Sequence, residues 1–176
     1  MIVGVGVDLL EIERIHEKLV DRILGKGEKE IYRLRNRKKE FLAGRFALKE
    51  AFFKALGTGI NGFRFADVEF LEDKGKPVLK IHRDFGLFNF AHISLSHDVF
   101  VIAVVVLEKR KGGIIVKGEE EKLSKNFEIL GRKDDGWEID SQLPPFVLKE
   151  ILQKLGCKLV KYGNILVAGC EENEHR

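Results

Sequence analysis

Asp8 is a carboxylate placed where a metal ion and a bulky anion would have room. It ends an alternating, β-branched stretch and shares one face with Gly4 and Gly6, which carry no side chains. A carboxylate at the end of such a strand suits a hard cation. The alternative interpretation is structural, because aspartate is also favoured as the N-cap of a helix, and a helix is expected from Ile12 onward.

Glu50 and Lys54 are one helical turn apart in a segment that is apolar nearly all round. On an exposed surface such a pair would be an ordinary ion pair worth about 0.3–0.5 kcal/mol. In a buried helix, a charge is kept only when it is paired or coordinated. We therefore expect Glu50 to join Asp8 on a Mg²⁺ ion while Lys54 contacts a phosphate group, a typical composition for a Mg²⁺ site.

His97 is the third candidate, because it closes a strand-like stretch just before a tight turn. A lone histidine is more often structural than functional. Ser94 and Ser96 fall on the opposite face by alternation, so the spacing supports no Ser-His-Asp triad. Gly4 and Gly6 lack the third glycine and the following helix of a dinucleotide-binding fingerprint, and that class is rejected.

The elements that must position these residues follow from the apolar periodicity. Helices are expected over Ile12 to about Leu24 and over Lys38 to Leu56, the second ended by Gly57. Strands are expected at Ile2–Asp8, Phe65–Phe70, Pro77–Ile81, Ala91–Ser96 and Phe100–Leu107. The fold class is therefore α+β, a largely antiparallel sheet packed on a long central helix.

Phenylalanine and glycine mark a boundary within the 176 residues, because 11 of the 13 phenylalanines precede residue 110 and Gly112-Gly113 follows it. We expect one domain over 1–110 and a small α+β extension over 114–176. In the extension, strands are expected near 114–116 and 127–130, and a helix follows Pro144-Pro145 and ends at Gly156. A hairpin around Gly163-Asn164 would pair Val160 with Val167 and Tyr162 with Ile165, and would set Cys157 opposite Cys170.

Composition restricts the function classes. No apolar run approaches the roughly 18 residues of a membrane span, and the start of the chain resembles a strand rather than a signal peptide, so a cytoplasmic protein with no membrane partner is expected. The segment from Arg22 to Lys39 holds eight basic and two acidic residues. Such a patch suits an anionic partner. A nucleic-acid-binding module is one alternative, although the segment lacks interleaved aromatic residues.

Three motifs carry a specific resemblance. They are Gly4-Val5-Gly6-Val7-Asp8-Leu9-Leu10-Glu11-Ile12-Glu13-Arg14-Ile15, Phe46-Ala47-Leu48-Lys49-Glu50-Ala51-Phe52-Phe53-Lys54-Ala55-Leu56-Gly57-Thr58-Gly59 and Ile93-Ser94-Leu95-Ser96-His97-Asp98. In this order they resemble the holo-[acyl-carrier-protein] synthases, the short, trimeric class of 4′-phosphopantetheinyl transferases. The resemblance covers residues 1 to about 109. The family usually stops there, so it offers no role for the extension.

The resemblance implies a reaction and a set of roles. The family transfers 4′-phosphopantetheine from coenzyme A to a serine of apo-acyl carrier protein and releases adenosine 3′,5′-bisphosphate. By matching position, Asp8 and Glu50 would hold Mg²⁺. Coenzyme A would be bound by a further set of matched residues: Arg45, Lys54, Gly57 and His97. The first helix would dock the carrier protein through a stripe of basic residues: Arg14, Lys18 and Arg22. A homotrimer with sites between subunits and no nucleic-acid partner is also implied.

Two departures and two questions accompany the resemblance. In the first departure, the stretch between the first expected helix and Phe41 looks short, and Gly25-Lys26-Gly27-Glu28 stands where a threonine- or serine-rich turn is common. The second departure is the extension itself. The group that deprotonates the serine stays open among a bound water, Glu50, Asp8 and His97. A structural or regulatory protein that keeps the fold without the activity is a further alternative, and the intact site residues argue against it.

Overall fold

The architecture is taken from a computed structural model that describes residues 1–170. A long first strand, β1 (Ile2–Glu11), is followed by the short 3₁₀ turns η1 (Ile12–Arg14) and η2 (Glu17–Leu19) and the single-turn helix α1 (Val20–Ile23). Helices α2 (Lys26–Leu34) and α3 (Lys38–Leu56) come next. A 3₁₀ turn, η3 (Phe65–Asp67), then leads into four strands: β2 (Val68–Asp73), β3 (Lys76–Ile81), β4 (Phe90–His97) and β5 (Phe100–Glu108).

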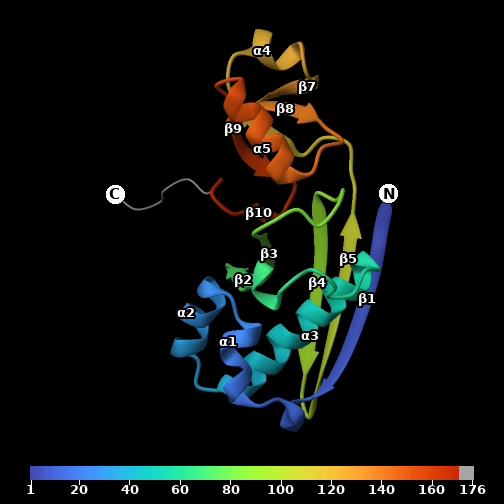
Figure 1. Cartoon of the computed structure of the whole chain (residues 1–176), viewed down its shortest axis with the longest axis vertical. Coiled ribbons are helices and arrows are strands. Elements are labelled where there is room, and N and C mark those ends of the chain that lie inside the picture. The colour runs from blue at the N-terminus through green and yellow to red at the C-terminus, as the bar shows by residue number, and fades with distance from the viewer. Residues whose placement is uncertain (171–176) are drawn as a thin grey trace.

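The extension builds its own layer above this body (Figure 1). Its elements are β6 (Ile114–Lys117), α4 (Glu120–Ser124), β7 (Glu128–Lys133), β8 (Gly136–Asp140), α5 (Pro145–Lys154), β9 (Lys158–Tyr162) and β10 (Leu166–Val167). Four of the strands form one antiparallel sheet in the order β7-β8-β6-β9. The last strand, β10, leaves that sheet and pairs in parallel with β3 of the body.

The body contains two sheets rather than the single sheet expected from the sequence. Strands β1, β5 and β4 form one antiparallel sheet, and β10, β3 and β2 form the other. Helix α3 lies across the first sheet (Figure 1). The α+β class and the long central helix are confirmed, and α3 has the expected bounds. Gly57 ends it in the left-handed conformation, with φ of 73°.

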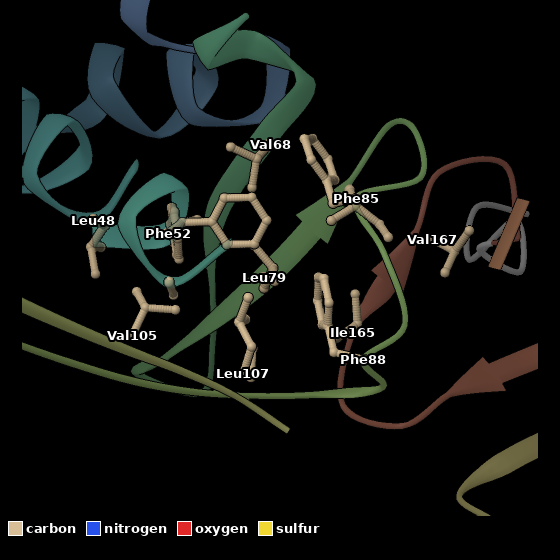
Figure 2. Close-up of a cluster of buried hydrophobic side chains, with 14 of the residues drawn as sticks. Leu48, Phe52, Val68, Leu79, Phe85, Phe88, Val105, Leu107, Ile165 and Val167 are labelled. Atoms are coloured by element: carbon tan, nitrogen blue, oxygen red, sulfur yellow. The ribbon is translucent and has the colours of Figure 1, made fainter. Parts of the chain in front are cut away.

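The core fills the space between α3 and the two sheets. Phe52 is fully buried and makes edge-on ring contacts with Phe70, Phe85 and Phe88. Ile165 from the extension lies beside Phe88 in the same cluster (Figure 2). The extension therefore contributes side chains to the core of the body, and is not merely tethered to it.

The expected helix from Ile12 to Leu24 is wrong. The chain forms the 3₁₀ turn η1, then extended backbone at Ile15 and His16, and then the 3₁₀ turn η2, which runs directly into the single turn of α1. The apolar residues of the expected stripe still reach the core, because Ile12, Ile15 and Ile23 are buried from separate turns. The apolar spacing indicated correctly which residues are buried, but it did not require that one continuous helix bury them.

Helix α2 was not expected from the sequence, and it begins at Gly25-Lys26-Gly27-Glu28. Glu28 forms the helix start, since its Oε2 accepts a hydrogen bond from the Gly25 amide at 2.9 Å. A Cβ at Gly27 would lie 2.8 Å from Oε2 of Glu69, so the glycine lets the helix approach β2 closely. Gly27 therefore allows α2 to pack closely against β2, and it does not form a turn.

In the extension, α5 lies where the sequence placed a helix, and Gly156 follows it with φ of 71°. The expected hairpin is correct only at its first pair, Tyr162 with Ile165. The pairing of Val160 with Val167 and the juxtaposition of Cys157 with Cys170 are wrong, because β10 pairs with β3 instead of β9. Strand β8 and helix α4 were not expected at all.

Candidate active site

Asp8 is brought to α3 by the glycines that precede it in β1. A Cβ on Gly6 would lie 1.8 Å from the Ala51 carbonyl oxygen, and one on Gly4 equally close to the Ala55 carbonyl oxygen. Only glycine permits the strand to lie this near the helix backbone. Asp8 follows on the same strand face, inside β1 rather than at a helix start, so the N-cap interpretation does not apply.

Lys54 pairs with Asp8 across the junction of β1 and α3. Its Nζ donates to Asp8 Oδ1 at 2.7 Å and to the Val7 carbonyl oxygen at 3.1 Å. The Asp8 side chain is largely buried, whereas that of Lys54 is half exposed. The expectation that Lys54 is buried with Glu50 is therefore wrong. The lysine holds its charge at the surface, above a carboxylate.

Glu50 is half-buried on α3 and lies near enough to Asp8 for the two charges to interact. Burial raises the pKa of the Glu50 carboxyl, and the Asp8 charge raises that pKa further, while Lys54 lowers it. The Asp8 charge thus disfavours ionised Glu50, and a cation bound between the two carboxylates would remove this repulsion. Among residues 1–170 no group of three or more His, Cys, Asp or Glu side chains is arranged for a metal. A cation held here would keep other positions for non-protein ligands.

His97 lies apart from this cluster, on the wall of a cavity. In the sheet register, Asp8 and Leu95 are both opposite Ala103, and His97 lies two residues further along β4, opposite Val101. It is exposed. The cavity beside it encloses about 580 Å³ and is lined by Leu34, Arg35, Asn36, Arg37, Glu40, Phe41, Gly44, Arg45, Glu72, Leu95 and His97.

Arg45 brings a positive charge to the wall of the same cavity. Its guanidinium lies 4.2 Å from the centre of the Phe41 ring, and Nη2 donates to Glu72 Oε1 at 3.0 Å. Its Nε is buried and has no hydrogen-bond partner among the described residues. The structure thus brings Arg45 and His97 together, as a second cluster beside the one formed by Asp8, Glu50 and Lys54.

Four charged residues of the cavity were not expected from the sequence: Arg35, Arg37, Glu40 and Glu72. Glu40 lies on α3 and forms an ion pair with Arg37. Arg35 and Arg37 lie in the short linker between α2 and α3, and Glu72 lies on β2. The basic segment from Arg22 to Lys39 was the available signal for the two arginines. Nothing in the sequence indicated that Glu72, far along the chain, would lie against them.

Gly57 stands one residue beyond α3, and its amide donates to the Lys54 carbonyl oxygen at 3.0 Å. It does not line the cavity that holds Arg45 and His97. A Cβ on Gly57 would meet no atom of the described residues within 4 Å. The backbone beside Lys54 is therefore open to an approaching group.

The three basic residues expected on one helix lie on three separate turns. Arg14 is on η1, Lys18 on η2 and Arg22 on α1. All three side chains are exposed. The prediction that these residues form a stripe on one helix is therefore wrong. They still lie in one stretch of the chain beside α3, because η1, η2 and α1 all contact that helix.

The β1-β5-β4 sheet carries apolar side chains on the face turned away from α3. Val5 is 58% exposed, and five more residues of this face or its end are also exposed: Val3, Val7, Leu9, Phe100 and Ile102. We name these six residues the valine face. An exposed apolar surface of this kind is typical of a protein interface. None of the described helices is long and apolar enough to cross a membrane.

Known proteins match this chain, some over nearly its whole length and others over about three-fifths of it. The family model described as the 4′-phosphopantetheinyl transferase superfamily matches residues 4–105. A holo-[acyl-carrier-protein] synthase of Thermotoga maritima is 65% identical over 167 residues, which cover 95% of this chain and 99% of the relative. One from Halalkalibacterium halodurans is 45% identical over 120 residues, covering 62% of this chain and 98% of that protein.

Solved structures likewise fall into those that cover nearly the whole chain and those that cover about three-fifths of it. The crystal structure of the Thermotoga maritima synthase superposes with a TM-score of 0.94 at 64% identity and covers 96% of this chain and 100% of its own. The Bacillus anthracis synthase, in complex with CoA (3′,5′-ADP), has a TM-score of 0.57 at 42% identity. It covers 62% of this chain and 99% of its own. Some relatives therefore share the extension, and others match without it.

Proposed function

The chain belongs to the 4′-phosphopantetheinyl transferase superfamily and is a transferase of the holo-[acyl-carrier-protein] synthase type, and we propose that it uses coenzyme A as donor in a Mg²⁺-dependent reaction. The acceptor is a serine of an apo-acyl carrier protein, and the second product is adenosine 3′,5′-bisphosphate. The observation that carries the proposal is the meeting of Asp8, Glu50 and Lys54 where β1 crosses α3.

The reaction is a displacement at phosphorus. The serine oxygen forms a bond to the β-phosphorus of coenzyme A, and the bond from that phosphorus to the bridging oxygen breaks. The hydroxyl proton leaves, and adenosine 3′,5′-bisphosphate departs with the bridging oxygen. Catalysis of such a step consists mainly of positioning and charge stabilisation, so it needs few reacting protein groups.

Asp8 and Glu50 would hold the Mg²⁺ ion. Their oxygens are the ligands that Mg²⁺ prefers, and two carboxylates leave room for phosphate oxygens and water. When bound, the ion neutralises charge on the diphosphate. The raised pKa of Glu50 beside the Asp8 charge supports the assignment, because a bound cation would favour the ionised form of Glu50. Lys54 already places an ammonium group at this point and would contact a phosphate of coenzyme A.

The 580 Å³ cavity would hold the nucleotide end of coenzyme A, with its 3′-phosphate near Arg45 and His97. Its size suits a ligand of this class. The cationic side chains on its wall supply charge-assisted hydrogen bonds for a phosphate. Leu34, which is 87% exposed and lines the cavity, offers an apolar surface next to the charges. Gly57 leaves open backbone beside Lys54 for the diphosphate.

The partner surfaces are also proposals. Arg14, Lys18 and Arg22 are exposed beside α3 and would dock an acidic carrier protein. The valine face would be covered in a homotrimer, because a large exposed apolar sheet face is costly in water. We place the enzyme in the cytoplasm, where coenzyme A and the carrier protein of fatty acid synthesis would meet it.

Mass spectrometry of an apo-acyl carrier protein tests the proposal directly. After incubation with the enzyme, coenzyme A and Mg²⁺, the carrier protein should gain one phosphopantetheine group on its serine, and adenosine 3′,5′-bisphosphate should appear in equal amount. Omitting Mg²⁺ or replacing the serine by alanine should abolish both products. Transfer that continues undiminished in a chelator would contradict the metal assignment, and no transfer at all would contradict the donor.

A further inference from the structure

One carboxylate, Glu72, holds two of the arginines that line the cavity. Arg35 Nη2 lies 2.6 Å from both oxygens of Glu72, and Arg45 Nη2 lies 3.0 Å from Oε1. The three side chains come from three segments: β2, the α2–α3 linker and α3. Because Glu72 lines the same cavity, its negative charge lies at the wall where the two guanidinium groups are presented.

Arg45 needs such a counter-charge in the free protein. Its side chain is only 6% exposed, and burial lowers the pKa of the guanidinium, while Glu28 and Glu72 act in the opposite direction. A buried charge without a partner is strongly unfavourable. Of the carboxylates near it, Glu72 is the one that makes a hydrogen bond to Arg45. Glu72 therefore supplies the negative charge and the hydrogen-bond acceptor that a bound anion would otherwise give to Arg45.

A phosphate group and a carboxylate use the same guanidinium donors. Both accept paired N–H groups from arginine in a planar arrangement, so they compete when they reach the same side chains. A carboxylate a few ångströms from a phosphate also repels it, and more strongly beside a protein wall than in open water. Glu72 thus competes with a bound phosphate for the same arginine side chains of the cavity.

We propose that Glu72 is an internal counter-ion that competes with the 3′-phosphate of the nucleotide for Arg35 and Arg45, and so limits the affinity of the cavity for that phosphate. The inference rests on the proposed function, because it assumes that the nucleotide end of coenzyme A occupies this cavity. Its consequence is selective. Glu72 lowers the affinity of the cavity for ligands that carry a 3′-phosphate, and it leaves the affinity for ligands without one unchanged.

Calorimetric titration of Glu72→Gln with adenosine 3′,5′-bisphosphate and with adenosine 5′-monophosphate tests this. Affinity for the bisphosphate should rise by about fivefold or more, because the opposing charge is gone. Affinity for the monophosphate should change by less than about twofold. Asp73→Asn is the matched control. It removes the same charge from the next residue of β2, which lines a different pocket beside β9 and β10, and should leave both affinities unchanged.

Glu72→Met removes the charge without placing an amide beside the guanidinium groups, and the same gain is expected. Glu72 is about one-third exposed, so both variants should fold, which thermal unfolding checks. A bisphosphate affinity that is unchanged or lower in folded Glu72 variants overturns the inference. If the unaltered enzyme itself binds both nucleotides equally, the placement of the 3′-phosphate in this cavity fails instead. The two failures are thus distinguishable.

Discussion

Lys54 Nζ lies 2.7 Å from Asp8 Oδ1, so the ammonium group already neutralises one of the two carboxylates that meet between β1 and α3. Glu50, the other carboxylate, forms no ion pair in the described part of the chain, and burial and the Asp8 charge raise its pKa. The site in the free protein is therefore partly charge-balanced, and the remaining imbalance lies at Glu50.

Replacing Glu50 by Gln should abolish most transfer activity while raising thermal stability in the absence of Mg²⁺. The pKa of Glu50 is raised in the folded state, so its ionised form opposes folding at neutral pH, and the neutral amide removes that cost. We expect turnover to fall by about 10²-fold or more. Turnover is measured by mass spectrometry of the carrier protein, and unfolding by calorimetry. Near-normal turnover at limiting Mg²⁺ would contradict the role of Glu50.

Reversing the charge of Arg14 should raise the KM for the carrier protein several-fold and reduce its dependence on salt. Rim charges act mainly by steering an oppositely charged partner, so affinity for coenzyme A should stay the same. Steady-state kinetics at two salt concentrations measure both. Lys158→Glu, on the exposed side of β9 in the extension, is the control and should change neither constant. An equal loss of coenzyme A affinity would move Arg14 to the nucleotide site.

A lysine in the valine face should prevent formation of the proposed homotrimer. Val5 lies at the centre of β1, is 58% exposed and is opposite Val106 on β5, so a charge here would be buried without a partner in any assembly that covers the face. We expect Val5→Lys to be monomeric in light scattering, and Val147→Lys on α5, also exposed, to remain trimeric. A wild-type protein that is monomeric and active at assay concentration would refute the trimer.

Lowering the pH should weaken the fold through Glu108. Hydrogen bonds from Arg110 and from His92 lower the pKa of this carboxyl to about 2. Because the folded-state pKa is below that of the unfolded chain, the contribution of Glu108 is present above about pH 4.5 and is lost as the pH falls toward 2. In urea unfolding, the stability difference between the wild type and Glu108→Gln should shrink over this interval. A difference that stays constant would contradict the assignment.

Removing everything after Arg110 should leave catalysis but lower thermal stability. The site residues all precede Arg110, and relatives that cover 62% of this chain match without the extension. The truncated chain would, however, lose Ile165 and Val167 from the core. Losses of this size lower Tm by at least about 10 °C. Activity at 25 °C and calorimetry test both statements, with Ile165→Ala in the full chain as a milder variant. A stable, soluble truncation without activity would place the extension in the active site.

The sequence predicted the site better than the elements around it. Asp8, Glu50 and Lys54 were expected together, and the structure brings them together because Gly4, Gly6 and the bounds of α3 are local features that a sequence displays directly. Their roles stay predictions. The helix from Ile12 to Leu24 failed because apolar spacing specifies burial and not continuity.

The apolar pattern of the sequence could not predict contacts between residues that are far apart in the chain. Glu72 and Arg35 are distant in the sequence, and only the packing of β2 against the α2–α3 linker makes them neighbours. The strand at Leu166–Val167 has the alternation of a hairpin, yet it pairs with the open edge of β3. A sequence shows that a segment can form a strand, but not which of several free edges it will join.

The carboxamide of Asn164 bonds to both the amide and the carbonyl oxygen of Ala91, at 2.8 Å each. Ala91 is on β4, at the rim of the β1-β5-β4 sheet, where unpaired backbone groups would otherwise accept a strand from another molecule. A single side chain from the extension thus occupies the place of an incoming strand. At this position a strand from another molecule cannot pair with β4, so the extension guards one end of the open sheet edge against edge-to-edge association.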